Sequence, residues 1–539
     1  MKPNYPKRLE GLIRLSQNLW WSWNWDAKEV FEMIDSKRFY QYSQNPIRLL
    51  ESLSNTEINS LMQSVEFLEK LDKVVEKFDN YMSVEKDKDS IAYFSMEFGV
   101  HDSLKIFSGG LGILAGDYLK QASDSNKNII GIGLLYRYGY FKQGLTKDGE
   151  QVSQMYPQKF THLPAQAVRD SNGEWKRVSI EFPGRTVQAK IWQINVGRIP
   201  LYLLDTDIEE NQSEDREITY QLYGGNWENR LKQEILLGIG GVRMLRVLGI
   251  NPNIYHANEG HSAFNSIERV NMMMNERKYS YAQSREIVRA STLFTTHTPV
   301  PAGHDVFSED LIRMYLSSYT ERLAISWEDF MALGRMNPED NEEKFSMSIL
   351  ALNFSSEVNG VSKIHRDVSR KMFAPMYKGY FPRESHIGYV TNGVHRPTWT
   401  SKIWEDLYQD IFPKEFDLLD STDYWKNINL VDDKRIWDLH QRSKELLGEY
   451  LAQRLEREYR SRAEDPKLII KTKESFSPKA LTIGFARRFA TYKRAHLLFT
   501  DIDRLDSIVN HPEYPVQFIF AGKAHPADKA GRDLIKKIV

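Results

Sequence analysis

The chain has 539 residues, and at about 150 residues per domain this length predicts three to four domains or two large lobes. Lys plus Arg total 72 and Asp plus Glu total 73, and the net charge of −1 excludes a basic nucleic-acid-binding protein and a polyacidic tail. The sequence contains no cysteine, which excludes disulfides, thiolate metal sites and a cysteine nucleophile. No apolar run approaches the ~18 residues of a membrane-spanning helix, and residues 1–6 lack the apolar core of a signal peptide. We therefore expect a cytoplasmic enzyme with no membrane or nucleic-acid partner.

Residues 1–85 are predicted to form a helical module, because their leucines and aromatic residues recur at helical spacing. Four tryptophans lie within six positions of this segment: Trp20, Trp21, Trp23 and Trp25. A platform for a sugar ring is one interpretation, since indoles stack on sugars. The favoured interpretation is an apolar seam that docks the module on its neighbour. The charged run 85–89 is predicted to be a solvated linker.

Residues 86–395 show the pattern of a large α/β lobe. A short apolar run at 91–96 predicts a buried parallel strand, and the glycine-rich loop 108–112 leads from it into a helix. The further elements expected are strands at 128–136, 253–256, 291–296 and 387–391, a strand-rich segment at 178–205, and helices at 228–248, 261–275 and 345–375. Such alternation of strands and helices predicts a parallel sheet with helices on both faces.

Residues 396–539 are predicted to begin a second lobe. The stretch 433–462 is dense in charged residues and predicts a long helix. Two βα units follow, with strands at 480–485 and 516–520 and helices at 493–509 and from 526 onward. A doubly wound sheet normally has about five or six strands, so we expect the second lobe to be incomplete within these residues.

The glycine loop 109–112 is the first candidate for ligand binding. It lies between a predicted strand and a predicted helix, where backbone N–H groups and the helix N-terminus attract an anion. A tight strand-to-helix turn explains the same glycines equally well. Both interpretations stay open on the residues alone.

A cluster of cations follows the predicted strand 480–485 and contains Arg487, Arg488, Lys493 and Arg494. At the carboxyl end of a parallel strand such cations face the crevice in which α/β sheets bind ligands, and they suit a phosphate. The alternative is a solvated basic helix start. The phosphate interpretation is favoured, because cations at a helix N-terminus are unfavourable without an anion.

Two groups of histidine and acidic residues resemble metal sites at first sight: His256, Glu259 and His261, and His297, His304 and Asp305. Neither has the spacing that puts two ligands on one face of a helix. We therefore expect no metal, and contacts to a ligand or its surroundings instead. Gly-x-Ser-x-Gly and Walker motifs are absent, which disfavours the corresponding reaction classes.

Nine sequence blocks occur in the same order as in the α-glucan phosphorylases: YFSMEFG (93–99), SGGLGILAGDYL (108–119), YRYGYFKQ (136–143), HANEGHSAF (256–264), TTHTP (295–299), VNGVSKIH (358–365), TNGVHRPTW (391–399), RRFATYKR (487–494) and FAGKAHP (520–526). The chain resembles this family from about residue 10 to its end. It resembles most the bacterial branch that has an N-terminal helical module of the LWWSWN type, here Leu19–Asn24.

The resemblance implies a GT-B fold, with two Rossmann-like lobes, the second incomplete here, preceded by the helical module. It implies reversible phosphorolysis of an α-1,4-glucan by inorganic phosphate, which gives glucose 1-phosphate with retained anomeric configuration. The implied cofactor is pyridoxal phosphate, acting through its phosphate group as a proton relay. A homodimer is a further expectation.

The resemblance also implies roles for single residues. His297, Arg488 and Lys493 would be catalytic; Glu97, Gly110, Leu111, Glu259, Asn392 and Tyr492 would contact the substrate; Trp399 and Arg487 would line the cofactor. The family more often has Lys where Arg487 stands. The family's cofactor lysine lies in a Gly-Thr-Ser-Asn-Met-Lys motif that does not occur in these 539 residues. We therefore expect that this chain by itself lacks the Schiff-base lysine.

Two alternatives stay in view. A nucleotide-sugar glucosyltransferase of the glycogen-synthase kind shares the GT-B plan, but its glycine loop places Lys two residues before the glycine pair. Here that position is Phe107, with Lys105 two residues earlier, which counts against this alternative. The other alternative is an inactive glucan-binding remnant. The missing cofactor lysine favours it, whereas the presence of Arg488, Lys493 and His297 does not.

Overall fold

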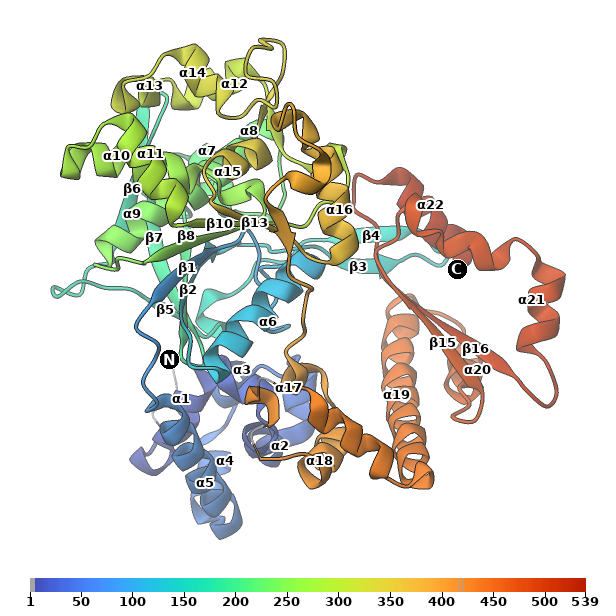
Figure 1. The fold of residues 1–539 in the computed structure, drawn as a ribbon. Coiled ribbons are helices and arrows are strands. Elements are labelled where there is room, and N and C mark those ends of the chain that lie inside the picture. The colour runs from blue at the N-terminus through green and yellow to red at the C-terminus, as the bar shows by residue number, and fades with distance from the viewer. Residues whose placement is uncertain (1–4, 415, 420) are drawn as a thin grey trace. The chain divides into compact units, whose positions relative to one another are not determined.

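The computed structural model describes residues 5–414, 416–419 and 421–539. The chain forms two compact units (Figure 1). The first unit comprises the described residues up to Tyr140 together with Pro157–Trp399, and the second comprises Phe141–Tyr156 and Thr400–Val539. The first unit thus includes most of the segments 1–85 and 86–395, whereas Phe141–Tyr156 groups with the second unit. The separation of 1–85 from 86–395 stays a proposal, as does the boundary at 396. None of the described helices is long and apolar enough to cross a membrane.

The N-terminal segment is helical, as the spacing of its apolar residues predicts. Its helices are α1 (Glu10–Ser16), α2 (Trp25–Gln41), α3 (Pro46–Glu51), α4 (Asn55–Gln63) and α5 (Val65–Met82), with short 3-10 turns at Lys7–Leu9 and Leu19–Trp23. Polar side chains cap the starts of α2 to α5; Ser54 and Glu57, for example, form a reciprocal capping box at α4.

The tryptophan-rich segment lies in the interior, which confirms the seam and contradicts the sugar platform. Trp20, Trp21 and Trp23 are buried. The ring of Trp21 lies 4.9 Å from that of His101, and Trp23 Nε1 donates to Asp124 Oδ1 at 3.3 Å. These partners belong to the α/β part of the first unit, so the indoles of Trp21 and Trp23 join the helical segment to it. The burial of Trp20, Trp21 and Trp23 makes these three rings unsuited to a sugar.

In the described part of the chain, ten strands form one sheet in the first unit (Figure 1). The order is β14-β13-β10-β9-β1-β2-β8-β7-β5, with β6 paired to β7. The strands are β1 (Ser90–Phe94), β2 (Asn128–Leu134), β5 (Ala165–Ala167), β6 (Arg177–Phe182), β7 (Arg185–Val196), β8 (Ile199–Asp205), β9 (Ile254–Asn258), β10 (Thr292–Thr296), β13 (Glu357–Gly360) and β14 (Ile387–Tyr389). Strands from β14 to β8 are parallel, and β5, β6 and β7 add an antiparallel edge. The predicted parallel α/β sheet is confirmed.

Helices of the first unit follow the predicted alternation, with one correction. They include α6 (Gly110–Asp124), α8 (Trp227–Ile235), α9 (Gly241–Val247), α10 (Phe264–Arg277), α11 (Tyr281–Ala290), α12 (Glu309–Leu316), α13 (Ser318–Leu323), α14 (Trp327–Ala332), α15 (Met347–Asn353) and α16 (Lys363–Met372). The single helix expected at 345–375 is wrong, because β13 interrupts it. Val358 is buried in β13, which pairs with β10 on one side and β14 on the other. Pairing with these two strands overrides the local preference for a helix.

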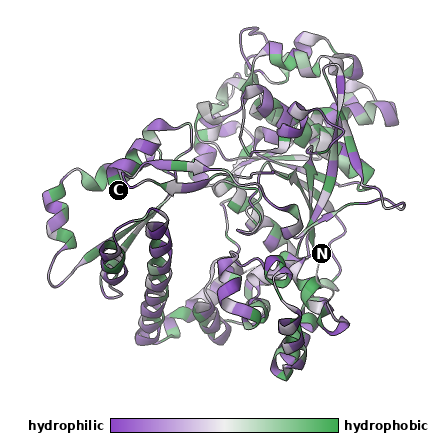
Figure 2. Ribbon diagram, turned by 180° about the vertical axis from the view of Figure 1, so that it is seen from behind, coloured by the Kyte–Doolittle hydropathy of each residue, from purple (hydrophilic) through white to green (hydrophobic). Residues whose placement is uncertain are grey.

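The second unit contains a long charged helix and a small parallel sheet. Its elements are the hairpin β3 (Lys142–Leu145) and β4 (Gln151–Gln154), α18 (Lys402–Ile411), α19 (Asp433–Ser461), α20 (Pro466–Ser475), β15 (Leu481–Ala486), α21 (Ile502–Val509), β16 (Val516–Ala521) and α22 (Lys529–Ile538). The parallel pairing of β15 with β16 confirms the predicted βα units. Figure 2 shows α19 hydrophilic along most of its length, in agreement with the predicted charged helix.

Candidate active site

The candidate site of the first unit lies where three neighbouring parallel strands end. Ser95 and Glu97 follow β1, Asn258 ends β9 with Glu259 after it, and His297 follows β10. Since β10, β9 and β1 are adjacent, their carboxyl ends bring these residues to one edge of the sheet. Open α/β sheets bind ligands at this edge.

A hydrogen-bonded chain joins the three strand ends. His297 Nε2 lies 2.6 Å from Asn258 Oδ1, and Asn258 Nδ2 donates to Ser95 Oγ at 3.1 Å. Because the amide nitrogen donates to the serine, the amide oxygen faces His297 and accepts from its Nε2–H. Burial lowers the pKa of His297, so the ring is neutral near pH 7 and its Nδ1 keeps a lone pair that can accept from a hydroxyl group.

Glu259 holds the loop that carries His297. Its Oε2 accepts from the backbone N–H of His297 at 2.9 Å and from Thr298 Oγ1 at 3.0 Å. Glu259 itself has φ 71°, a conformation that costs a non-glycine residue of the order of 1–3 kcal/mol. Such backbone strain persists where surrounding interactions hold the residue in place. Here the hydrogen bonds that the buried Glu259 carboxylate accepts stabilise the strained conformation.

Glu97 holds the glycine loop in the same way. Its Oε2 accepts from Ser108 N at 2.7 Å and from Gly109 N at 3.4 Å, while Oε1 accepts from Tyr223 Oη at 2.6 Å. A Cβ on Gly112 would lie 2.7 Å from Glu97 Oε2, so the close approach of helix α6 to this carboxylate requires glycine. Burial raises the pKa of Glu97, and the three donors oppose that shift.

The start of α6 is open toward a ligand. A Cβ on Gly109 or Gly110 would meet no described atom within 4 Å, and no described side chain caps this helix. The first amides of α6, among them those of Gly110 and Leu111, therefore have the unpaired N–H groups and positive potential that bind anions. The segment from β1 to α6 is longer than a tight turn, because β1 ends at Phe94 and α6 begins at Gly110. The binding of an anion by these amides stays a prediction.

Sequence reasoning missed a buried ionic group beneath this site. Arg230 donates to Asp305 Oδ2 at 2.6 Å, and its Nε lies 3.1 Å from Glu234 Oε1. Its guanidinium also lies 4.5 Å from the ring of Tyr223, which holds Glu97. Burial alone would raise the pKa of Asp305, but Arg230 brings it well below its ordinary value, whereas burial raises that of Glu234. Arg230 and Glu234, opposite charges four residues apart in a polar helix, gave no clear signal of burial in the sequence.

The histidines that resembled metal ligands have other partners. His256 Nε2 lies 2.8 Å from Thr295 Oγ1, and His304 Nδ1 lies 2.6 Å from Ser348 Oγ. His261 Nε2 lies 3.5 Å from Asp305 Oδ2, and burial lowers its pKa to about 4. No group of three or more His, Asp or Glu side chains suited to a metal ion was found among the described residues.

Asn392 and Trp399 lie in the segment that follows β14. The backbone N–H of Asn392 donates to Val361 O at 3.1 Å, and its side chain is exposed. The indole of Trp399 is also exposed, and its Nε1 donates to the buried Asp117 Oδ2 at 2.8 Å. Asp117 is a residue of α6, so the helix that carries the glycine loop also fixes this tryptophan.

The remaining predicted residues belong to the second unit. Arg487, Arg488 and Tyr492 are exposed and Lys493 is half-buried. The predicted helix 493–509 is wrong in its start: 3-10 turns occupy Thr491–Lys493 and Ala495–Phe499, and α21 begins only at Ile502. Arg494 has φ 53°, which no α-helix tolerates. The argument that these cations need an anion because they begin an α-helix therefore fails. Their role in phosphate binding stays a prediction, as does their convergence with Gly110 and His297.

These observations define a class of protein: an α/β protein with a parallel-rich sheet whose carboxyl edge carries a polar constellation and a glycine-loop helix. The family model described as carbohydrate phosphorylase matches residues 250–539. A second model, described as a protein of unknown function (DUF3417), matches residues 5–104.

Several curated proteins are similar over the whole chain. The maltodextrin phosphorylase of Thermococcus litoralis is 39% identical, covering 100% of this chain and 64% of that protein. The glycogen phosphorylase of Mycobacterium tuberculosis is 38% identical, covering 100% and 65%, and that of Aquifex aeolicus is 37% identical, covering 98% and 76%. The chain thus spans a little under two thirds of the length of the first two relatives.

The chain belongs to the carbohydrate phosphorylase family, which confirms the resemblance found in the sequence. The large parallel-rich sheet and the helical N-terminal region are consistent with a GT-B type fold.

Proposed function

We propose that the protein containing this chain is an α-1,4-glucan phosphorylase, which transfers a glucosyl unit from a glucan to inorganic phosphate and retains the anomeric configuration. The observation that carries the proposal is the glycine loop at the start of α6, held open by Glu97 at the same sheet edge as His297. Amides for an anion and a neutral acceptor for a hydroxyl group are what a phosphate and a sugar together need. The names of the relatives, maltodextrin and glycogen phosphorylase, point in the same direction.

In this proposal the residues of the first unit bind and orient the sugar. His297 Nδ1 accepts from a sugar hydroxyl, while the amides of Gly110 and Leu111 bind an anionic oxygen. Glu97 and Glu259 act mainly by holding these loops in place, because most of their oxygens already accept backbone or side-chain donors. Asn392 is the further sugar contact from the segment after β14.

The residues proposed to bind the attacking phosphate belong to the second unit. Arg488 and Lys493 bind the attacking phosphate, Tyr492 contacts the sugar, and Arg487 lines the cofactor. Arg488 suits this role because a guanidinium binds phosphate through two charge-assisted hydrogen bonds. Neither Arg488 nor Lys493 forms an ion pair within the part of the chain that the structure describes.

Phosphorylases of this family in general use pyridoxal phosphate, and we propose it as the cofactor. Two features support it: the space above Gly109 and Gly110 is open, and Trp399 presents an exposed ring that donates to Asp117. The family's Schiff-base lysine motif does not occur in these 539 residues. When bound, pyridoxal phosphate supplies a phosphate group that relays a proton to and from the substrate phosphate. A homodimer and a cytoplasmic location stay predictions.

The test is an assay of the complete gene product that contains this chain. With maltodextrin, inorganic phosphate and pyridoxal phosphate it is expected to release glucose 1-phosphate. Glucosyl transfer from a nucleotide sugar without pyridoxal phosphate would instead support the glycogen-synthase alternative. Glycogen binding without any turnover would support the inactive remnant.

A further inference from the structure

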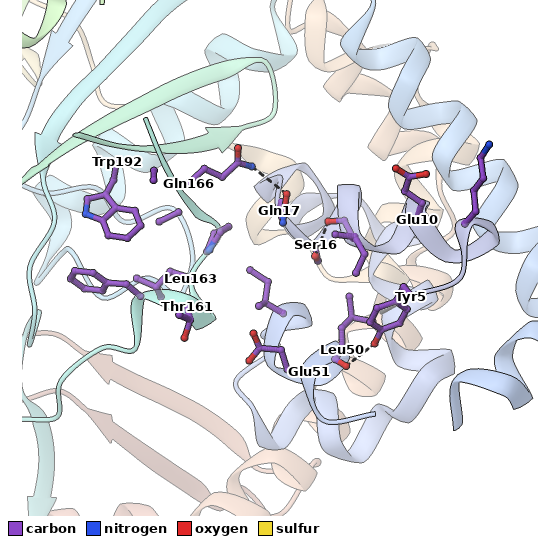
Figure 3. A pocket seen from close by; sticks show the side chains of 17 residues that line it. Tyr5, Glu10, Ser16, Gln17, Leu50, Glu51, Thr161, Leu163, Gln166 and Trp192 are labelled. Carbon is purple, nitrogen blue, oxygen red and sulfur yellow. Dashed lines mark hydrogen bonds between the residues drawn. The ribbon is translucent and has the colours of Figure 1, made fainter. Parts of the chain in front are cut away.

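The helical N-terminal segment borders the α/β part of the first unit at places that differ in packing. At one of them a cavity of about 660 Å³ separates α1 and α3 from β5 and the turn before it (Figure 3). Gln166 Nε2 donates across this cavity to Gln17 Oε1 at 3.3 Å. At another, side chains of the segment are hydrogen-bonded to α6, the helix that carries the glycine loop. The contact with α6 therefore fixes the segment more closely to the candidate site than the loosely packed contact with β5 does.

Asp124, at the end of α6, joins the helical segment to the residues that follow β14. Its Oδ1 accepts from Tyr81 Oη at 2.7 Å and from Trp23 Nε1 at 3.3 Å, and both donors belong to the helical segment. Its Oδ2 lies 2.9 Å from His395 Nε2. Because a carboxylate only accepts hydrogen bonds, the histidine is the donor. One carboxylate thus connects two parts of the chain that lie more than 300 residues apart.

His395 is fully buried and is held on several sides. Its Nδ1 lies 2.8 Å from Thr398 Oγ1, and its backbone N–H donates to Asp117 Oδ2 at 3.1 Å. The ring of Trp23 meets the imidazole edge to face, with ring centroids 5.6 Å apart. The imidazole cannot turn without leaving a buried polar group unpaired, which costs stability.

One face of α6 supplies the remaining contacts. Asp117, Lys120 and Asp124 are three and four residues apart, so they lie on the same side of the helix. Asp117 Oδ2 accepts from Trp399 Nε1 at 2.8 Å, and Lys120 Nζ donates to Thr398 Oγ1 at 3.1 Å. The helix whose first amides belong to the glycine loop therefore also anchors the segment 395–399.

The anchored segment lies next to two candidate site residues. Asn392 precedes His395 by three residues, and Trp399 follows it by four. The side chains of Asn392 and Trp399 are exposed, so close packing does not hold them. Their positions depend on the backbone of this short segment, and His395 is its fully buried anchor.

We propose that the helical N-terminal segment positions residues of the proposed active site through Asp124 and His395. Tyr81 donates to the Asp124 carboxylate, which in turn accepts from His395. The buried His395 ring then fixes the segment that carries Asn392 and Trp399. Asp124 and His395 are positioning residues, since they act through these neighbours. The effect on sugar binding rests on the proposed function, whereas the anchoring rests on hydrogen bonds within the first unit.

Hydrogen exchange of the complete gene product that contains this chain tests the anchoring. Tyr81→Phe removes a donor to Asp124 without touching the residues after β14, and His395→Leu removes both ring contacts. Peptides that cover residues 391–399 are expected to exchange about 2- to 30-fold faster in both variants, the range that coupling through such networks covers. His395→Gln keeps an N–H donor for Asp124 and is expected to restore most of the protection.

Steady-state kinetics of the same variants test the positioning. Glucose 1-phosphate contains the sugar unit that Asn392 is proposed to contact, so its KM in the direction of glucan synthesis reports on this residue. Tyr81→Phe and His395→Leu are expected to raise this KM about 2- to 30-fold while kcat changes less. Loss of a contact made in both the ground state and the transition state acts mainly on KM. His395→Gln is expected to recover most of the KM.

Matched controls remove similar bonds elsewhere in the first unit. Tyr40 Oη donates to Glu32 Oε1 at 2.6 Å within the helical segment, and Tyr319 Oη donates to the buried Glu268 Oε2 at 2.6 Å. Tyr40→Phe and Tyr319→Phe are expected to leave the exchange of residues 391–399 and the KM unchanged, even where they lower the unfolding free energy.

The outcomes separate this proposal from the proposed function. Faster exchange with a raised KM, both recovered in His395→Gln, supports the positioning role. Faster exchange without activity in any form, the unaltered protein included, supports the anchoring, while the proposed function fails. Unchanged exchange in Tyr81→Phe and His395→Leu, equal effects in the control variants, or faster exchange with an unchanged KM overturns the positioning role.

Discussion

The carboxyl edge of the first unit and the basic loop of the second handle charge in opposite ways. In the first, Glu97, Glu259, Arg230 and Asp305 are buried or nearly so, and each has hydrogen-bonding partners. In the second, the cations of residues 487–494 are exposed or half-buried. Burying a charge costs desolvation free energy unless the charge is paired. The polar groups of the first site therefore hydrogen-bond to one another, which makes the site rigid. Exposed cations need no partner and stay available for an anion.

The strands beneath the two sites also differ in burial and in the number of neighbouring strands. β1 has a neighbour on each side, and Ala92, Tyr93 and Phe94 are buried. β15 pairs with β16 alone in the described part of the chain, and Leu481 is 62% exposed. Local stability follows the density of buried apolar contacts. The comparison teaches that the geometry near the first site is preorganised, whereas the described strands beneath the second site give its loop less support.

The largest effect is expected from the ionic group under the first site. Arg230→Met leaves Asp305 and Glu234 buried without their cation, and removing one member of such a group costs about 3–5 kcal/mol of unfolding free energy. The matched variant Arg488→Met is expected to change stability by less than about 0.5 kcal/mol, because the side chain is exposed. Urea unfolding of both variants measures the difference. Similar losses in the two would contradict the contrast between buried and exposed charge.

The second effect concerns phosphate use by the complete gene product. Arg488→Ala removes a bidentate contact typically worth about 1.5–3 kcal/mol, which predicts a loss of about 10- to 150-fold in phosphate-dependent kcat/KM. Unfolding free energy is expected to stay nearly constant. Steady-state kinetics with varied phosphate measure the effect. An unchanged phosphate dependence would remove Arg488 from the proposed site.

The third effect tests the close packing of α6 against Glu97. In Gly112→Ala the added Cβ would lie 2.6 Å from Phe107 Cβ and 2.7 Å from Glu97 Oε2, and overpacking of this kind costs about 1–3 kcal/mol. Gly109→Ala meets no described atom and serves as the control, with an expected change near zero. Thermal unfolding of both variants is the measurement. Equal Tm values would show that the loop shifts to accommodate the added Cβ without a loss of stability.

The smallest effect is a pH dependence from Lys120. This buried lysine donates to Thr398 Oγ1 at 3.1 Å, and burial lowers its pKa to about 8, while Asp117 opposes the shift. Between pH 8 and the unfolded value near 10.4, the unfolded chain binds more protons than the folded one, so stability rises with pH.

Lys120→Met should abolish this contribution. The unfolding free energy of the unaltered protein minus that of the variant is expected to increase by at most about 1.4 kcal/mol per pH unit from pH 8 to 10, and to be flat below pH 7. Denaturant titrations at several pH values give the difference. A constant difference across this range would show that Lys120 keeps its ordinary pKa.

Local patterns were sufficient for most of the first unit. Short apolar runs became β1, β2 and β10, and the glycine loop became the start of α6, because strand and helix signals there agree with what their neighbours require. The pattern failed at residues 345–375, where pairing on both sides made a strand of Glu357–Gly360. It failed again after Lys493, where a left-handed Arg494 delays the helix to Ile502.

The sequence by itself determined the parallel α/β class, the helical N-terminal segment, the family and the candidates Glu97, Gly110, Glu259 and His297, because ordered motifs and hydrophobic periodicity are local properties of the chain. Only the tertiary structure decided what these residues do to one another. The hydrogen bond from His297 to Asn258 joins positions 39 residues apart, and that from Tyr223 to Glu97 joins positions 126 apart. Such partners depend on which strands lie side by side and on the need to pair every buried polar group. A local stretch of sequence contains neither piece of information.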